Sequence, residues 1–398
     1  MIEQFRIEKL VYGGEGLSRV NGEVVFTPFV LPGELVQAER TGSRKHAQRA
    51  RTVGVVEGSE ARVVPECPYF GRCGGCQYQH AGYAAQLDLK RGILAETLRR
   101  VGKIEFEESR IEVLSAEPYG YRNRAQFHFE KGRMGYREMN SLKLVPIEKC
   151  PISSPKINEA IARLSRMSRE RRWPNFLRSL EIFTDERHVQ WNVLDTERPV
   201  AKYFFEWLAE EVPGTVFGPL EYAVNEDEFT VSGPAFFQVN RFLLPRLAAA
   251  AIGDATGASA WDLYAGVGLF SVPMARRFEH VTAVEAGRAA AADLKTNARR
   301  AHKQIAIVQE QTEAFLDEAA EAPEFVLADP PRSGLDKRAV SRLAELAPKT
   351  IVLVACDPAT LARDLAGLLV RYEIERVQMV DLFPQTFHIE TIVRLRAI

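Results

Sequence analysis

Residues 259–275, SAWDLYAGVGLFSVPMA, decide the fold of this chain. Their pattern predicts a strand, a tight turn through Gly266 and Gly268, and then a helix. Glycines at these two positions permit a sharp turn and let a ligand approach the backbone closely. Beyond residue 255 strands and helices alternate, with further strands expected at 280–285, 305–308, 325–328 and 351–354. This alternation is typical of an α/β domain built on a parallel sheet.

The carboxyl ends of these strands carry a candidate cofactor site, because open α/β sheets bind ligands in the crevice at that edge. A dinucleotide site would have a third glycine near position 271 to seat the pyrophosphate, but Ser271 stands there. S-adenosylmethionine has no pyrophosphate, so the shorter turn suffices for it. Glu285 ends the second strand, where a carboxylate can accept both ribose hydroxyls. Gln311 follows the third strand, where an adenine ring would lie.

The loop after the strand at 325–328 presents an aspartate, Asp329, followed by two prolines that make the loop rigid. Amino-group methyltransferases carry a similar Asp-Pro-Pro followed by an aromatic residue that stacks on the base. Arg332 occupies that place here. The arginine therefore counts against methylation of an adenine amino group.

Cys356 follows the strand at 351–354 in IVLVACDPATLARD (351–364), and a helix is expected from Ala359. A cysteine there is either a reactive group at the ligand crevice or a small buried apolar residue, and the local pattern leaves both open. Near the end of the chain, Glu390 lies in the apolar segment VDLFPQTFHIETIVRL (380–395). An acid in that context is either half-exposed on an edge strand or positioned to act as a base.

The chain has five cysteines, an odd number that argues against a disulfide framework. Cys67, Cys73 and Cys76 form a C-x5-C-x2-C group, and Cys150 lies further along. Four thiolates suit either a 4Fe–4S cluster or a tetrahedral zinc ion. Zinc sites more often use two close pairs, so three grouped cysteines and a remote fourth favour the cluster over zinc or four unligated thiols. Radical chemistry on S-adenosylmethionine typically uses C-x3-C-x2-C, a different spacing.

Short strand-like runs separated by glycine turns occupy residues 5–57, which indicates a small five-stranded barrel of the OB type. Such barrels commonly bind oligonucleotides, and a structural cap is the alternative. The segment resembles a TRAM domain, an RNA-binding module of RNA-modifying enzymes. The resembling positions are Leu10, Gly13, Gly14, Gly16, 25–28 and 32–35.

The net charge of −1 does not by itself indicate a nucleic-acid-binding protein. Two local basic segments are either binding sites for a polyanion or solvated faces. They consist of Arg40, Arg44, Lys45, His46, Arg49 and Arg51, and of Arg163, Arg166, Arg169, Arg171 and Arg172 beside Trp173.

At 398 residues the chain is long enough for two or three domains. Its start, MIEQFRIEKL, carries acids and no apolar core, so we do not expect a signal peptide. No apolar run approaches the roughly 18 residues of a membrane span. We therefore expect a cytoplasmic protein, without membrane contact and without a feature that requires an obligate protein partner.

Seven motifs occur in one order: C-x5-C-G-G-C, the remote Cys150, FFQVN (236–240), DLYAGVGLFS (262–271), DPPRSGL (329–335), CDPATLARD (356–364) and P-x-T-x-H-I-E (384–390). Together they resemble the RNA uracil-5-methyltransferase family, in its cluster-bearing 23S rRNA branch, over essentially the whole chain. The resemblance implies a class I, Rossmann-like α/β methyltransferase domain at 236–398 that uses S-adenosylmethionine. It also implies a TRAM barrel at 1–57 and a central α+β iron–sulfur domain at 58–235 that binds RNA. A helix at 84–100 is expected to pack on the catalytic domain.

The resemblance implies residue roles as well. Cys356 would add to carbon 6 of uracil and make carbon 5 nucleophilic, and Glu390 would then remove the carbon-5 proton as general base. Gln238 and Asp329 would lie by the uracil ring and the methyl donor. The cofactor-binding residues are expected to be Gln238, Tyr264, Gly266, Gly268, Glu285, Gln311 and Asp329, and the cluster ligands Cys67, Cys73, Cys76 and Cys150.

The expected function is therefore methylation of carbon 5 of a uridine in 23S rRNA. A tRNA T-loop uridine methyltransferase is the nearest alternative, although that branch generally lacks both the cluster and the TRAM domain. A radical S-adenosylmethionine enzyme and a non-catalytic RNA-binding protein are alternatives from other classes. The chain departs from some relatives at Leu269 and Asp357, where they have asparagine. The carboxylate of Asp357 would disfavour a thiolate beside it unless it is paired, and Arg363 is the expected partner.

Overall fold

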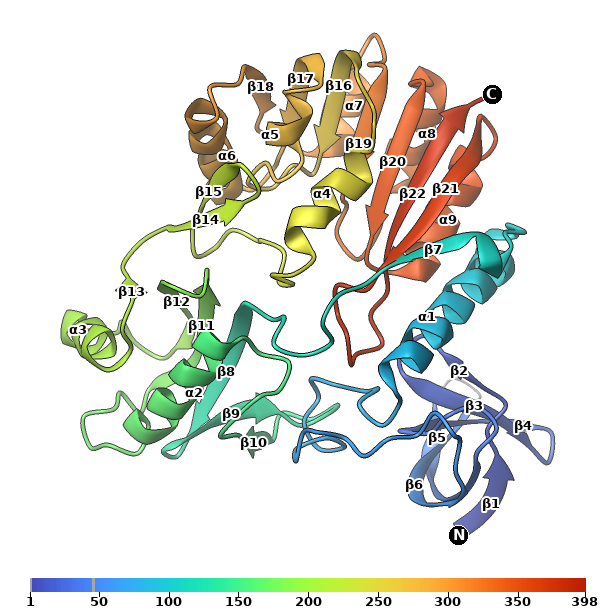
Figure 1. The fold of residues 1–398 in the computed structure, drawn as a ribbon, viewed down its shortest axis with the longest axis vertical. Helices are drawn as coiled ribbons and strands as arrows, with labels where there is room; N and C mark the ends of the chain where they lie inside the picture. Colours follow the sequence, from blue (N-terminus) through green and yellow to red (C-terminus); the bar gives the residue numbers. More distant parts are fainter. Residues whose placement is uncertain (1, 45–46) are drawn as a thin grey trace.

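The computed structural model describes residues 2–44 and 47–398, so Lys45 and His46 of the first basic segment lie outside the described residues. Figure 1 shows three parts: a large sheet with helices at the top, a second sheet with helices at the lower left, and a small N-terminal sheet at the lower right. Helix α1 (Tyr83–Thr97) lies between the small sheet and the large one. In the part of the chain that the structure describes, no helix is long and apolar enough to cross a membrane.

Within the described chain, the large sheet has eight strands in the order β18-β17-β16-β19-β20-β22-β21-β7. Helices cover both of its faces, so a strand such as β20 needs apolar side chains on both sides and is buried almost throughout. The predicted strands at 305–308 and 325–328 match β18 and β19, and the mixed α/β fold is confirmed. The bounds are β18 (Ile305–Val308), β17 (Phe278–Val284), β16 (Gly257–Leu263), β19 (Phe325–Ala328), β20 (Thr350–Ala355), β22 (Glu390–Ala397), β21 (Tyr372–Val380) and β7 (Ile111–Leu114).

The helices divide between the two faces of this sheet. One apolar core joins it to α1, α7 (Thr312–Glu318), α8 (Lys337–Leu346) and α9 (Pro358–Leu368). The other joins it to α4 (Leu244–Ile252), α5 (Ser271–Met274) and the hairpin of β14 (Leu220–Val224) and β15 (Asp227–Val231). Helix α6 (Arg288–Arg300) packs through Leu294 against β17 and β18, and it also contacts β15.

Two strands take places that the sequence pattern does not reveal. β22 runs antiparallel between β20 and β21, so the final segment of the chain lies inside the sheet rather than at its edge. β7 pairs parallel with β21 at the edge, although its residues fall in the range expected for the central domain. The hairpin β14–β15, in the same expected range, packs on α6. The part built on the large sheet thus includes segments that precede residue 236.

The N-terminal sheet has the order β1-β5-β6-β4-β3-β2. β1 and β2 are separated only by residues 7–8, yet they pair at opposite ends of this order. The sheet must therefore curl on itself into a small barrel, with one broken first strand joining both ends. Its interior contains apolar side chains such as Ile7, Val25 and Val36. The bounds are β1 (Ile2–Arg6), β2 (Lys9–Val11), β3 (Glu15–Val20), β4 (Glu23–Pro28), β5 (Leu35–Arg44) and β6 (Ala47–Glu57).

The central sheet has the order β10-β9-β8-β11-β12-β13, and α2 (Pro155–Met167) and α3 (Lys202–Glu211) pack on it. The second basic segment lies on this part. Trp173 is buried in its core, while Arg166 and Arg172 pair with Glu211, so that segment is partly a salt-bridged surface. The strands are β8 (Arg124–Glu130), β9 (Arg133–Arg137), β10 (Leu144–Pro146), β11 (Leu177–Thr184), β12 (Val189–Thr196) and β13 (Thr215–Val216).

Helix α1 continues into a π-helical turn at Leu98–Gly102, and together they occupy the range expected for a helix at 84–100. Leu94 and Leu98 are fully buried in the core that contains α9. Gly102 permits the close approach, because a Cβ atom there would lie 2.7 Å from the Ala362 carbonyl oxygen. The helix is therefore packed directly on the part built on the large sheet.

Candidate active site

Cys356 and Glu390 meet at the edge of the large sheet that the carboxyl ends of its parallel strands form, next to the end of β20 and the start of β22. β20 and β22 are antiparallel, with Ala355 opposite Thr391, and the same register carried one residue further sets Cys356 against Glu390. Directly opposed residues on neighbouring strands have Cβ atoms about 4.5–5.5 Å apart. The pairing therefore joins two groups that are distant in sequence.

Asp329 approaches the same edge from the other side of β20. The preceding residue, Ala328 of β19, pairs with Leu353 of β20, and the Asp329 amide donates to the Leu263 carbonyl oxygen at 3.3 Å. Burial raises the pKa of Glu390 well above its usual range, and the nearby charge of Asp329 raises it further. Burial likewise raises the pKa of Asp329. Both carboxyls thus hold a proton more readily than exposed acids do.

The Cys356 thiol is held in its neutral form at ordinary pH. Burial, and then the charge of Glu390, raise its pKa to about 11, while the Arg332 guanidinium opposes the shift. A thiolate is the reactive form of cysteine, so this site favours nucleophilic attack only after a positive charge or a proton acceptor lowers the pKa of the thiol.

The expected pairing of Asp357 with Arg363 is wrong. Asp357 caps the N-terminus of α9, where its carboxylate accepts from the Ala359 and Thr360 amides at 2.9 and 3.0 Å. Arg363 instead pairs with Asp364 at 2.6 Å. The physical reason is local: a helix cap satisfies Asp357 at once, and a residue six positions on lies beyond the i+4 neighbour that a helix brings within reach.

A sharp turn follows β16 at the same edge of the sheet. Tyr264, Gly266 and Gly268 have positive φ angles of 62°, 57° and 94°, and an added Cβ at Gly268 would lie 2.5 Å from a Leu294 methyl carbon. The Glu285 carboxylate accepts from the Gly266 amide at 2.8 Å and also from the Gly287 amide. Space above Gly266 is open, as a bound ligand requires.

The other predicted cofactor residues lie on two separate segments. The Tyr264 hydroxyl donates to Glu313 at 3.0 Å, and Gln311 is the exposed N-cap of α7. Gln238 is buried, and Asn240, two residues on, donates to the Leu382 carbonyl oxygen at 3.1 Å. Gln238 thus lies on a segment tied to the loop before Glu390, whereas Tyr264 and Gln311 belong to the turn and its neighbouring helix.

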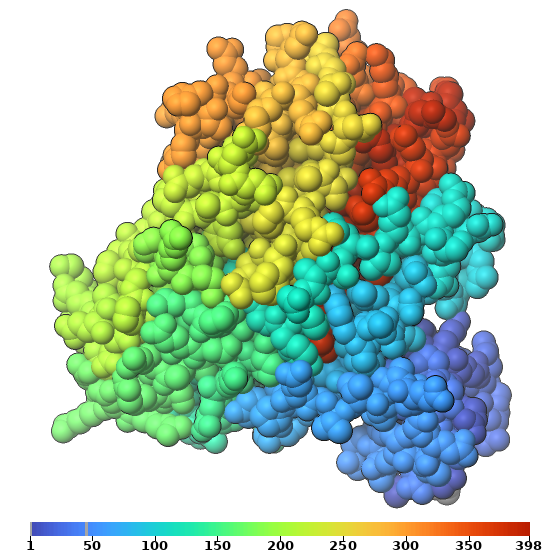
Figure 2. Space-filling view, in the orientation of Figure 1, coloured from blue at the N-terminus to red at the C-terminus, as the bar shows by residue number. Residues whose placement is uncertain are grey.

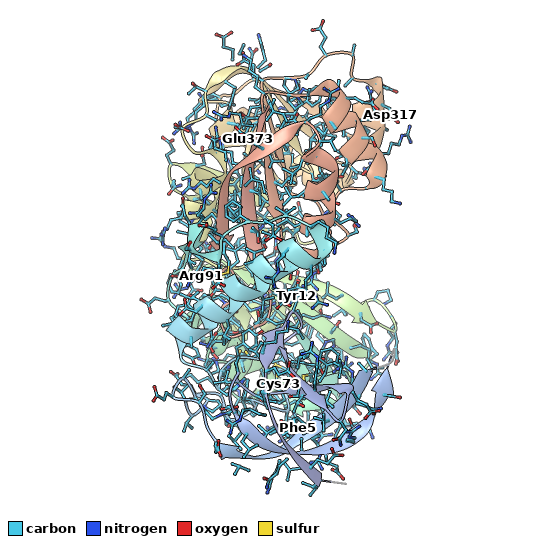
Figure 3. All side chains as sticks on the ribbon, turned by 90° about the vertical axis from the view of Figure 1, so that its right-hand side faces the viewer. Phe5, Tyr12, Cys73, Arg91, Asp317 and Glu373 are labelled. Carbon is cyan, nitrogen blue, oxygen red and sulfur yellow. The ribbon has the colours of Figure 1, made fainter. Side chains whose placement is uncertain are left out.

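Sequence reasoning missed two residues of this site. Asp262 is fully buried on β16, accepts from the Ser271 hydroxyl, and leaves Oδ1 without a partner among the described residues. An acid within an apolar strand was the signal that could have identified it. Tyr12 of the barrel donates to the Cys356 carbonyl oxygen at 3.2 Å, and no local signal marks it. Figure 3 shows Tyr12 at the upper edge of the barrel, facing the catalytic part.

The four other cysteines line one cavity of about 1130 Å³ between the barrel, the cysteine-bearing segment and the central sheet. Arg49, Arg51, Arg122 and Arg137 also line it. Burial raises the pKa of Cys73 to about 11, and the neighbouring Cys150 and Cys67 thiols add to the shift, so these sulfurs lie within electrostatic reach of one another. In residues 2–44 and 47–398, no three His, Cys, Asp or Glu side chains are grouped so as to hold one metal ion.

Known proteins share this architecture. A family profile described as tRNA (Uracil-5-)-methyltransferase matches residues 219–398. An uncharacterized RNA methyltransferase of Aquifex aeolicus is 33% identical over 98% of this chain and 97% of its own, and one of Thermotoga maritima is 30% identical over 99% of both. The solved Pyrococcus abyssi tRNA (uracil-54, C5)-methyltransferase, in complex with S-adenosyl-L-homocysteine, is 26% identical, with a TM-score of 0.81 and coverage of 98% of this chain and 99% of that one.

The strand order, the glycine turn and the acids at the strand ends define an S-adenosylmethionine-dependent methyltransferase of the α/β class. The chain belongs to the RNA uracil-5-methyltransferase family, as the seven motifs predicted. It is an enzyme that methylates carbon 5 of uracil in RNA, with S-adenosylmethionine as the methyl donor.

Proposed function

We propose that this enzyme methylates a uridine of 23S rRNA through covalent addition of Cys356 and proton removal by Glu390. The observation that carries the proposal is the register of β20 and β22, which sets the cysteine against the acid. Methylation of uracil at carbon 5 needs one group to activate the ring and a second to remove a proton. These two side chains supply both.

The reaction follows from the chemistry of the ring. Carbon 5 of uracil is a weak nucleophile until Cys356, having lost its proton to solvent, adds as a thiolate to carbon 6, which moves electrons into an enolate. S-adenosylmethionine, when bound, supplies the methyl group to carbon 5. Glu390 then accepts the carbon-5 proton, and the returning double bond expels the Cys356 thiolate. The raised pKa of Glu390 suits it to accept a proton from carbon.

We assign the methyl donor to the turn after β16. The sulfonium is a cation, and Asp262, whose Oδ1 has no partner among the described residues, is a buried acid on β16 two residues before Tyr264. Each Glu285 oxygen that accepts a backbone amide keeps a lone pair for a ribose hydroxyl. The full proposed set is Gln238, Tyr264, Gly266, Gly268, Glu285, Gln311 and Asp329, to which we add Asp262.

We also propose a 4Fe–4S cluster bound by Cys67, Cys73, Cys76 and Cys150. All four line one cavity, and burial disfavours the free thiolates of Cys67, Cys73 and Cys76, which iron would stabilise. A single zinc ion needs its ligands grouped around one point, and the described residues contain no such group of three. In a cluster each cysteine binds its own iron, which suits thiols spread around a cavity.

The RNA would contact the barrel and the central part. We assign residues 1–57 to a TRAM domain and 58–235, apart from β7 and the β14–β15 hairpin, to the iron–sulfur and RNA-binding domain. The assignment is supported by Arg49, Arg51, Arg122 and Arg137, which line the cavity between the two parts. Cationic side chains in one concave surface bind a phosphate backbone. With free cysteines and an RNA substrate, we assign the enzyme to the cytoplasm.

A tRNA uridine is the second candidate substrate, because the solved Pyrococcus abyssi relative is a tRNA (uracil-54, C5)-methyltransferase with a TM-score of 0.81. The four cysteines favour 23S rRNA. Incubation of the enzyme with S-adenosylmethionine and either 23S rRNA or tRNA, followed by mapping of 5-methyluridine, separates the two. Methylation of 23S rRNA alone supports the proposal, and methylation of tRNA alone contradicts it.

A further inference from the structure

The loop at 381–389 leads directly into Glu390. It leaves the catalytic sheet between β21 and β22 and, in Figure 1, hangs below the sheet toward the other two parts of the molecule. Figure 2 shows only a small red patch of it between the teal and blue segments. A loop enclosed in this way can have its shape fixed by neighbours from outside the catalytic domain.

Helix α1 holds the first half of this loop through a buried ion pair. The Lys90 ammonium donates to Asp381 Oδ1 at 2.6 Å and to the Phe383 carbonyl oxygen at 3.0 Å. The Tyr83 hydroxyl donates to Asp381 Oδ2 at 2.8 Å. The side chains of Lys90 and Asp381 are both 0% exposed. A buried ion pair rarely stabilises a fold more than an apolar pair of the same volume, so stability alone does not account for it.

A second contact fixes the tip of the loop. Gln86 of α1 donates to the Gln385 side-chain oxygen at 2.9 Å and accepts from the Gln385 amide at 3.0 Å. The Gln385 carbonyl oxygen accepts from the amides of Gln77 and Tyr78, both at 2.9 Å. Gln385 has a φ angle of +69°, in the left-handed region that a glutamine adopts only when its surroundings hold it there.

These contacts all act on the loop, and none acts on β20. We propose that Lys90 and Gln86 are positioning residues for Glu390: they hold the loop at 381–389 so that the carboxylate faces carbon 5 of the bound uracil. The proposal rests on the proposed role of Glu390 as general base. Cys356 and most of the donor-site residues follow β20, β16, β17, β18 and β19, outside this loop. Gln238 is the exception, since its segment is joined to the loop by the hydrogen bond from Asn240 to the Leu382 carbonyl oxygen, which none of the variants below removes.

The two halves of the reaction should therefore respond differently when the loop is released. Addition of Cys356 and methyl transfer continue, while removal of the carbon-5 proton slows, because the base is displaced. A displacement of about 1 Å costs a catalytic group on the order of 100-fold in rate. The methylated RNA then stays bound to Cys356 as a covalent adduct, which a purely structural role would not produce.

The test compares Lys90→Met, Gln86→Leu and the triple variant Tyr83→Phe/Lys90→Met/Asp381→Leu. The triple variant removes the buried network as a whole, so no charge is left unpaired, and its side chains keep nearly their original volume. It should therefore fold even if Lys90→Met, which leaves Asp381 buried without its cation, does not. Arg91→Met is the matched control, since Arg91 is the next residue on α1, pairs with Asp88 and Glu108 away from the loop, and is partly exposed (Figure 3).

Single-turnover reactions use radiolabelled S-adenosylmethionine and an unmodified transcript of the substrate RNA. They measure methyl transfer to the RNA and release of the methylated RNA separately. We expect label to reach the RNA within about twofold of the unaltered rate, and release of free RNA to slow by at least about tenfold, with adduct visible on a denaturing gel. Arg91→Met should show neither effect. Equal loss of both steps, or normal release in the folded triple variant, would overturn the proposal. If the Glu390→Gln variant also forms no covalent adduct with the RNA, that result counts against the proposed function itself rather than against the role of Lys90 and Gln86.

Discussion

The ionisation of Cys356 can be tested directly with an alkylating agent. With a pKa of about 11, about one thiol in 1000 is ionised at pH 8, against about one in four for an ordinary cysteine with a pKa of about 8.5. Only the thiolate reacts, so alkylation of Cys356 by iodoacetamide should be about 200-fold slower than in the unfolded chain. The rate should rise about tenfold per pH unit from pH 7 to pH 10, without levelling off.

Peptide mass spectrometry separates Cys356 from the other cysteines and gives its rate alone. The slope against pH does not depend on how freely the reagent enters the site, so partial burial does not imitate the effect. Glu390→Gln removes the second cause of the raised pKa and should increase alkylation of Cys356 near pH 9. A rate that levels off below pH 9 in the unaltered enzyme would refute the reasoning.

Three further outcomes follow from the contacts. Gly268→Ala should destabilise the fold by about 1–3 kcal/mol in urea unfolding, because φ is +94° and the new methyl would meet Leu294; unchanged stability would contradict this. Tyr12→Phe removes the hydroxyl that donates to the Cys356 carbonyl oxygen and should lower the free energy of unfolding by about 1 kcal/mol, whereas no change would show that the contact is not formed. Anaerobically purified enzyme should be brown, and Cys150→Ser should lose iron; colourless protein with one zinc per chain would exclude the cluster.

The catalytic sheet could be predicted because its strands carry a strong local signal. A strand buried on both faces is apolar at nearly every position, as in β19 and β20, so its place is readable from a few residues. The glycine turn after β16 is equally local, since its positive φ angles favour glycine.

The pairing that forms the catalytic centre could not be predicted in the same way. That β22 lies antiparallel between β20 and β21 depends on contacts between distant segments, and only this order sets Cys356 against Glu390. Lys90 illustrates a second reason. A lysine on an amphipathic helix is expected at the surface, and its complete burial depends on Asp381, far along the chain.

The account rests most directly on the covalent step between Cys356 and uracil. Glu390→Gln retains the nucleophile but lacks the base, so incubation with RNA and radiolabelled S-adenosylmethionine should trap methylated RNA on the protein. The labelled complex should survive a denaturing gel, and its cross-linked peptide should contain Cys356. Normal turnover by this variant, with no covalent complex, would contradict the account.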